Sequence, residues 1–440
     1  MTAAASNCPA GGAATAARRP DPQHRRNFRS IVACELCWNF GLPFSSASTV
    51  LPLVVLTLGG RGPHVGALAA INEIFVAGSV LAPWLFNHAP RLRNRVIVTY
   101  VAGCGGYLPM ALGVFGVLTG HVPAAIALPA LLLICLATRV TCSAADIGYR
   151  ALIAQNLESG SQLTGYGKIF CLAYVAAMPG GALASWFHRT AALAPLARYA
   201  LSLLATFILV QAGNMALLPL RNVRPLPPDA LQPRRADWRQ VLSHSVFRRY
   251  ILARIFFGGR LILTSFLAVY AARELGLGTA TIVSFAVWQA LGGALGMYCF
   301  GHLAQRSGAV HSILYGAVGA LAGIVLAVLW RCPFALSLAM FFDGAATASQ
   351  AVTDYGLPLE IVGEHEAIPF YAAAAAIPAI PLFLYSFWVG DAVFAHGYVP
   401  LAVLSALAVA ASVLLFGTIA GMVPGQRTAR ERAGAQAGGA

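Results

Sequence analysis

The sequence predicts an all-α membrane protein with twelve transmembrane helices arranged as two pseudo-symmetric six-helix bundles. Of its 440 residues, 58% are hydrophobic and only 10% are charged, and the mean hydropathy is +0.72. A soluble chain of this length needs far more charged surface. About twelve apolar runs follow one another, most of them longer than the roughly 20 residues that a bilayer requires. The basic residues gather on one side of these runs, which is typical of cytoplasmic loops.

Each apolar run predicts one transmembrane helix. The first run is broken by Pro43 and Pro52, and the eleventh carries Pro369, Pro378 and Pro381. Such interruptions are tolerated in a membrane where neighbouring helices satisfy the freed backbone groups. We expect helices at residues 30–58, 65–86, 95–118, 122–145, 164–187, 198–219, 250–272, 278–300, 309–330, 333–355, 368–392 and 397–421.

The distribution of positive charge predicts the orientation. Of the 29 lysine and arginine residues, 21 fall in six segments at the two ends and after every second apolar run, and five fall in the opposite loops. Short loops rich in lysine and arginine stay in the cytoplasm. We therefore expect both termini to be cytoplasmic, in what we take to be a bacterial inner membrane. The net charge of +14 does not indicate nucleic-acid binding, because the arginines are spread through loops between apolar runs.

The same reading divides the chain into five parts. A cytoplasmic tail at 1–29 precedes an N-terminal bundle at 30–219, and a C-terminal bundle at 250–421 precedes a second tail at 422–440. The linker at 220–249 begins rich in proline, which favours an extended conformation, and its second half has the pattern of an amphipathic interfacial helix.

Three pairs of short motifs suggest that the two bundles are copies of one unit. Phe86-Asn-His88 and Phe300-Gly-His302 follow the second and eighth helices, at an offset of 214 residues. Asp146-Ile-Gly148 corresponds to Asp354-Tyr-Gly356 with an offset of 208, and Phe28-Arg29 to Phe247-Arg248 with an offset of 219. The constant order and similar spacing are typical of a duplicated six-helix unit.

One loop carries a resemblance to a known family. Gly301-His-Leu-Ala-Gln-Arg-Ser-Gly308 resembles the G-x-L-a-D-r-x-G-r loop of the major facilitator superfamily, with Gln305 in place of the usual acid. The equivalent first loop, residues 87–94, keeps basic charge but lacks the glycines and the acid. Arg139 begins a segment similar to R-x-x-x-G, and Pro179-Gly-Gly181 resembles a reduced antiporter motif. The resemblance spans about residues 28–421 and implies two bundles that rock about a central site, with helix seven lining the cavity.

Ionisable residues far from a helix end are the candidates for function. A charge in the middle of a membrane helix costs roughly 2.5–3.5 kcal/mol on insertion scales, so it usually faces a cavity and has a partner or a task. Asp343 and Arg260 are expected near the bilayer midplane, Glu73 towards the outside and Arg139 in the inner half. We interpret Arg260 and Arg139 as cavity residues and Asp343 or Glu73 as the proton carrier. The alternative for each is a structural ion pair between helices.

Further polar residues complete the candidate site. The amides of Asn39 and Gln289 are expected to face the solute, because amides are costly in contact with lipid. A group nearer the cytoplasmic face is expected to act in gating, with solvated side chains as the alternative interpretation: Glu35, Arg254, Asp146, Asp354 and Arg306.

These patterns favour a secondary active transporter that moves a small organic solute by alternating access, with coupling to protons. The arginines in the membrane favour an anionic or zwitterionic solute, and we expect a monomer without cofactor or bound metal. The alternative is a sensor or scaffold on the same fold that transports nothing. An enzyme is not indicated, because the sequence lacks H-E-x-x-H, G-x-S-x-G and the phosphate-binding G-x-x-x-x-G-K-[ST] motif.

Overall fold

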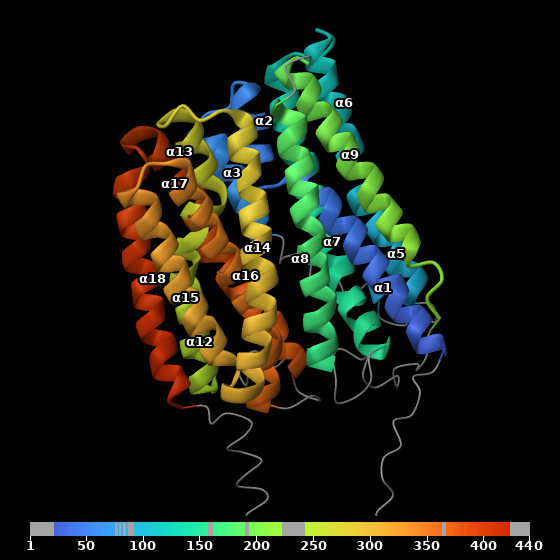
Figure 1. Ribbon diagram of the computed structural model, residues 1–440, viewed down its shortest axis with the longest axis vertical. Helices are drawn as coiled ribbons and strands as arrows, with labels where there is room; N and C mark the ends of the chain where they lie inside the picture. Colours follow the sequence, from blue (N-terminus) through green and yellow to red (C-terminus); the bar gives the residue numbers. More distant parts are fainter. Residues whose placement is uncertain are drawn as a thin grey trace, which may run out of the picture.

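The computed structural model describes residues 22–74, 78, 81, 85–86, 92–156, 162–189, 193–221, 243–362 and 367–422. Every regular element in these ranges is helical (Figure 1). In the N-half (residues 22–221) the elements are α1 (Pro22–Gly41), η1 (Leu42–Ser45), α2 (Val50–Thr57), α3 (Gly62–Ile74), α5 (Leu92–Cys104), α6 (Tyr107–Leu118), α7 (Ala124–Asn156), α8 (Gln162–Arg189) and α9 (Pro195–Ala216). In the C-half (residues 243–422) they are α12 (Ser245–Phe257), η3 (Gly258–Arg260), η4 (Ile262–Phe266), α13 (Leu267–Arg273), α14 (Thr279–Ser307), α15 (Ala309–Leu329), α16 (Pro333–Val362), α17 (Ala367–His396) and α18 (Tyr398–Ala420).

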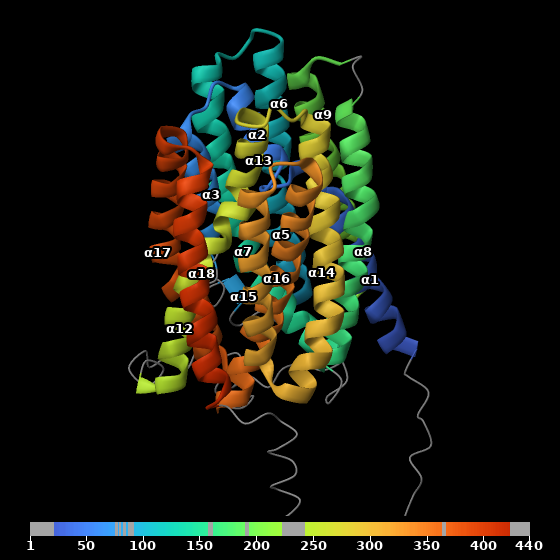
Figure 2. The ribbon, with the colours of Figure 1, turned by 60° about the vertical axis from the view of Figure 1, so that its left-hand side comes forward.

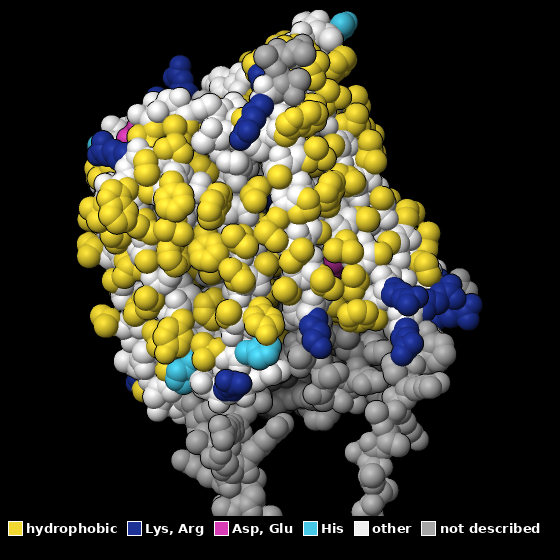
Figure 3. Space-filling view, in the orientation of Figure 1, with side chains coloured by type: hydrophobic (Ala, Val, Ile, Leu, Met, Phe, Trp, Pro, Cys, Tyr) yellow, Lys and Arg dark blue, Asp and Glu magenta, His cyan; other side chains and the backbone are white. Residues whose placement is uncertain are grey.

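The membrane-spanning character of the chain is clear from its helices and its surface. Ten of the described segments are helical, long and apolar enough to cross a membrane. Large apolar side chains cover the flanks of the molecule, and the basic side chains gather towards its two ends (Figure 3). Leu414 and Leu133, for example, are 74% and 67% exposed. Surface of this kind is stable only against lipid, so the protein is an integral, multi-pass membrane protein.

Three of the expected helices are interrupted. The first is divided into α1 and α2 by the short 3-10 helix that contains Pro43, as the prolines predicted, whereas Pro378 and Pro381 lie inside the continuous helix α17. The third is divided at Gly105–Gly106. The seventh passes from α12 through a 3-10 turn and a π-helical turn into α13. Irregular turns of this kind inside membrane helices frequently mark functional sites.

The N-terminal tail was expected to extend to residue 29, but α1 begins at Pro22. The fully buried Asn27 explains the difference. Its amide donates to the Asn156 side chain at 2.5 Å and to the Arg221 carbonyl at 2.7 Å, which ties the start of α1 to the end of α7 and to the segment that follows α9. Residues 222–242, which include most of the expected amphipathic linker helix, lie outside the described residues.

The two halves lie side by side and meet along two pairs of helices. Helix α8 packs against α14, and α3 packs against α17 (Figures 1 and 2). Glycines allow the second pair to approach closely: a Cβ atom on Gly66 would stand 2.8 Å from the carbonyl oxygen of Phe387, and Gly390 faces Gly66 directly. Side chains from both halves can therefore meet near the middle of the bundle.

Candidate functional site

A line of polar side chains runs along one face of α16. Asp343, Thr347, Gln350 and Asp354 follow each other at spacings of four, three and four residues, which places them on one helix face. Asp343 is fully buried, whereas the side chain of Asp354 is 26% exposed. The line therefore leads from the interior of the C-half towards the end of the molecule where α1 begins.

Arg260 is bound to this line at three points. Its Nη1 atom donates to Asp343 Oδ1 at 2.8 Å and to Thr347 Oγ1 at 3.2 Å, and its Nη2 atom donates to Gln350 Oε1 at 3.0 Å. Arg260 ends the 3-10 turn, immediately before the π-helical turn. The irregular backbone thus presents the guanidinium to α16, and the Arg260–Asp343 ion pair confirms that these two mid-helix charges are partners.

The same aspartate is connected to the other half of the protein. Gln289 on α14 donates from Nε2 to Asp343 Oδ2 at 2.8 Å, and its Oε1 atom accepts a hydrogen bond of 3.1 Å from Ser48 of the N-half. Gly344 makes this contact possible, because a Cβ atom there would collide with the carbonyl oxygen of Gln289. One buried carboxylate thus receives hydrogen bonds from two helices and, through Gln289, contacts the opposite half.

The line ends in a second ion pair. Arg254 Nη2 lies 3.3 Å from Asp354 Oδ2, and the Tyr250 hydroxyl donates to Asp354 Oδ1. Gln350 links the two ends, because its Nε2 atom donates to Asp354 at 3.4 Å. The ion pair that the structure shows for Arg254 is therefore with Asp354, which was also expected to act in gating, rather than with Glu35.

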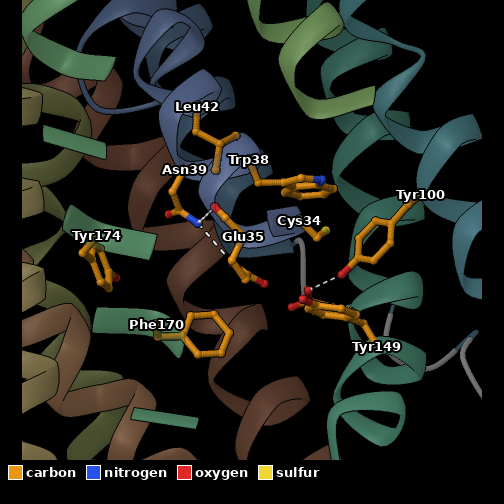
Figure 4. A pocket seen from close by; sticks show the side chains of 10 residues that line it. Cys34, Glu35, Trp38, Asn39, Leu42, Tyr100, Tyr149, Phe170 and Tyr174 are labelled. Atoms are coloured by element: carbon orange, nitrogen blue, oxygen red, sulfur yellow. Dashed lines mark hydrogen bonds between the residues drawn. The ribbon is translucent and has the colours of Figure 1, made fainter. Parts of the chain in front are cut away.

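A cavity of about 210 Å³ lies in the N-half, between α1, α5, α7 and α8 (Figure 4). Glu35, which is 8% exposed, supplies a carboxylate to it, and Asn39 Nδ2 donates to Glu35 Oε2 at 3.0 Å. Asp146 also lines the cavity and accepts a hydrogen bond of 2.8 Å from Tyr100. The structure thus brings Glu35, Asn39 and Asp146 together, although only Asn39 was expected at a solute site.

Aromatic rings form much of the remaining wall of this cavity. Trp38 and Tyr100 meet edge to face, with 4.8 Å between ring centroids, and Tyr100 and Tyr149 do so at 5.8 Å. Trp38 is further fixed by a hydrogen bond of 3.0 Å from its Nε1 atom to Asn214. Rings that are held in this way present their faces without a large loss of conformational entropy on binding. The described lining residues are Cys34, Glu35, Trp38, Asn39, Leu42, Tyr100, Asp146, Tyr149, Phe170 and Tyr174.

The other expected site residues lie apart from these groups. Arg139 lies beside Tyr107 and Cys135 and does not line this cavity. Arg306 is exposed near the end of α14. Glu73 belongs to α3, but its side chain lies outside the described residues.

Most of the cavity wall and part of the line on α16 were not evident from the sequence. Tyr100, Tyr149 and Tyr174 were not singled out, because aromatic residues on membrane helices more often face lipid or pack together. Thr347 and Gln350 could have been found from their spacing to Asp343. Ser48 gave no signal, since only the folded arrangement places it opposite Gln289.

Comparison with known proteins is informative at the level of structure. No protein-family model matches the sequence, and no curated protein matches it. Among solved structures, the chain is similar to a bacterial homologue of the iron transporter ferroportin in its inward-facing state, with a TM-score of 0.64, 16% identity and coverage of 90% of this chain and 99% of that one. It is also similar to the human organic anion transporter MFSD10, with a TM-score of 0.60, 11% identity and coverage of 90% and 100%.

The E. coli fucose:proton symporter is a third similar structure, with a TM-score of 0.59, 12% identity and coverage of 90% of this chain and 99% of that one. At such low identity the likeness concerns the fold, and it extends over nearly the whole of each compared protein. All three are transporters of one superfamily, the one that the loop at 301–308 resembles. The chain has the fold of the major facilitator superfamily.

Proposed function

We propose that the protein is a secondary active transporter of a small organic solute and works by alternating access. The observation that carries this proposal is the contact chain from Ser48 through Gln289 to the buried Asp343–Arg260 pair. A charged pair at the core of one half, bonded to the other half, is a place where binding or protonation can alter how the halves fit together. The transport functions of the structurally similar proteins are consistent with this proposal.

The full architecture belongs to the same proposal. Helices α3 and α16 would join the ten apolar segments to give twelve spans in two six-helix bundles, at about 30–219 and 250–421. The charge distribution supports a cytoplasmic location in a bacterial cell for both termini, with the tail and linker segments. Reporter fusions after Ala440 and within residues 59–64 should give opposite signals, and identical signals would contradict this topology.

We assign proton coupling to Asp343, with Glu73 as the second candidate. The charged Asp343 receives hydrogen bonds from Arg260 and Gln289, and a proton on it would weaken both. Gln289 would then be free to leave Ser48, which would loosen this contact between the halves. The line through Gln350 to the partly exposed Asp354 offers a polar route to the carboxylate.

The gating role is assigned to residues at the cytoplasmic end, in particular the Arg254–Asp354 pair and Arg306. In the conformation described, Arg254 is bound within its own half. A different pairing, including one with Glu35, would belong to another state of the transport cycle. The protein is proposed to act as a monomer.

The test of coupling uses the protein in vesicles and compares Asp343→Asn with wild type. If Asp343 carries the proton, the variant should lose flux driven by a pH gradient but retain exchange between equal solute pools, because exchange need not release the proton. If Asp343 is only the structural partner of Arg260, the variant should lose stability, and adding Arg260→Gln should restore it.

If Asp343→Asn retains undiminished gradient-driven flux, Asp343 is not the proton carrier, and Glu73 becomes the candidate. Measurement of solute flux by the wild-type protein distinguishes a transporter from the alternative, a sensor or scaffold that transports nothing. Wild-type protein that shows neither flux nor exchange for any solute that it binds would favour that alternative.

A further inference from the structure

We propose that the cavity in the N-half is a binding site for a compact organic cation, held between the Glu35 carboxylate and the surrounding aromatic rings. This inference rests on the proposed transport function, because it names the chemical class of the transported solute. It departs from the expectation of an anionic or zwitterionic solute, which depended on the mid-membrane arginines. Arg260 and Arg254 are each paired with an aspartate, so their charge is already balanced within the C-half.

The charge of the cavity is the first argument. Glu35 is buried and accepts a hydrogen bond from Asn39, but among the described residues no basic side chain forms an ion pair with it. Asp146 lies within electrostatic range, and the described lining contains no lysine, arginine or histidine. A buried carboxylate without a countercharge is unfavourable, and a bound cation would supply the missing charge.

The aromatic wall is the second argument. Trp38, Tyr100, Tyr149, Phe170 and Tyr174 all line the cavity, and Figure 4 shows these rings arranged around Glu35. The faces of aromatic rings carry negative potential and attract alkylated ammonium groups, which also gain from apolar contact. A carboxylate at one side and several rings around it therefore suit an organic cation better than a strongly hydrated ion.

A tyrosine hydroxyl beside Glu35 adds a further polar group to the cavity. The Tyr149 side chain is 4% exposed, and its hydroxyl lies close enough to Glu35 for the two groups to interact. Figure 4 shows this hydroxyl turned towards Glu35 and the interior of the cavity. A ligand in the cavity would therefore meet the carboxylate and this hydroxyl together.

The size and composition of the cavity limit the solute further. Ligand pockets usually enclose roughly 300–1,000 Å³, so a cavity of about 210 Å³ suits a compact molecule. A metal ion would need several ligating side chains together. In the described residues no group of three or more histidine, cysteine, aspartate or glutamate side chains is placed to hold one.

Tyr174 connects this site to the proposed coupling site. It lies within electrostatic range of Glu35 as well as of Asp343 and Arg260, and its ring packs against Gly293 of the C-half. A cation that contacts this ring would therefore touch the surface where α8 meets α14. Binding in the N-half could in this way influence the packing of the two halves.

The test measures equilibrium binding to the purified full-length protein in lipid nanodiscs, so it does not depend on transport. Radiolabelled choline is the probe, and its uncharged isostere 3,3-dimethylbutan-1-ol and the anion 3,3-dimethylbutanoate are competitors. We expect choline to bind at least about tenfold more tightly than the uncharged isostere, a difference typical of one charge-assisted contact. Glu35→Gln should remove that difference, and Glu35→Asp should retain part of it.

Glu274→Gln is the matched control, because Glu274 is exposed and bonds to the backbone nitrogen of Tyr398, far along the chain from the cavity residues. It should bind choline as wild type does. Equal binding of choline and its isostere, stronger competition by the anion, or no saturable binding of choline or tetraethylammonium would each overturn the proposal. If Co²⁺ displaces choline from wild type and this displacement is lost in Glu35→Gln, the proposal is overturned in favour of a metal site. Cation binding without any flux would instead contradict the transport function and leave the site intact.

Discussion

The two halves carry similar polar groups at equivalent places, but they balance charge differently. In the C-half, Arg254 on α12 pairs with Asp354 on α16, which also accepts a hydrogen bond from a tyrosine. In the N-half, the place equivalent to Arg254 is occupied by Glu35, at an offset of 219 residues, and Asp146 corresponds to Asp354 at an offset of 208. Asp146 again accepts from a tyrosine, Tyr100. The place that holds the arginine of an ion pair in the C-half therefore holds a glutamate at the wall of a cavity in the N-half.

This difference shows how the two halves of one fold can take different tasks. The C-half contains buried charges that neutralise each other, so it can respond to a proton without binding a solute. The N-half leaves a carboxylate unbalanced beside a cavity, so it can attract a solute of opposite charge. Substitutions that disturb the charge pair in the C-half or introduce one in the N-half test this division.

The largest effect is expected from Arg260→Ala. The change leaves Asp343 charged and fully buried, and it removes the donors to Thr347 and Gln350. Breaking a buried pair by removal of one partner costs about 3–5 kcal/mol, and transport should be abolished or strongly reduced. Thermal unfolding of the purified protein and flux in vesicles measure the two effects.

Arg273→Ala serves as the control for that change. Arg273 is exposed and lies over the Phe394 ring at 4.3 Å, so its loss should cost no more than about 1 kcal/mol. Near wild-type transport by Arg260→Ala would show that the guanidinium neither contacts the solute nor takes part in coupling.

A somewhat smaller loss is expected from Gly344→Ala. The added methyl group would collide with the Gln289 carbonyl oxygen and push α16 away from α14. Overpacking of this kind typically costs about 1–3 kcal/mol, and here it should also separate Gln289 from Asp343. Gly417→Ala is the matched control, because a Cβ atom there meets no atom within 4 Å. Equal melting temperatures for the two variants would show that α14 and α16 are not closely fitted at this point.

Much of the fold could be predicted from the sequence, because apolar length and loop charge depend on composition alone. The breaks at Gly105 and at the π-helical turn after Arg260 could not, since they depend on how neighbouring helices pack. For the site, the sequence identified Asp343, Arg260 and Gln289 as polar residues in an apolar run. It could not show that Asp343 and Gln289 meet, because that contact depends on the close approach at Gly344.

The cavity is a second feature that depends on how the helices pack and that the sequence alone could not predict. Glu35 was interpreted as a gating residue because it lies near the cytoplasmic end of its expected helix. Only the arrangement of α5, α7 and α8 around α1 surrounds it with tyrosines. The gating hypothesis for Glu35 stays a prediction about another conformation, and its place at the cavity is the new information.

Glu35→Arg tests the comparison by giving the N-half the residue type of the C-half. The new guanidinium should pair with Asp146, as Arg254 pairs with Asp354, and should fill part of the cavity. We expect loss of cation binding together with an unchanged or slightly raised melting temperature. The reverse change, Arg254→Glu, places two carboxylates together and should lower the melting temperature. A large loss of stability in Glu35→Arg would contradict the proposed equivalence of the two places.

The smallest effect is expected from Tyr149→Phe in the N-half, and Tyr250→Phe in the C-half is the change with which it is compared. Tyr250→Phe removes a hydrogen bond to the Asp354 carboxylate, and bonds to charged groups contribute about 1.5–3 kcal/mol. Tyr149→Phe removes a buried hydroxyl that interacts with Glu35, and the loss of this bond should cost no more than about 1 kcal/mol. If that hydroxyl also contacts the solute, Tyr149→Phe should weaken choline binding severalfold with only a small loss in melting temperature. Tyr149→Phe protein that binds choline as wild type does, and that loses as much stability as Tyr250→Phe, would show that this hydroxyl has a structural role alone.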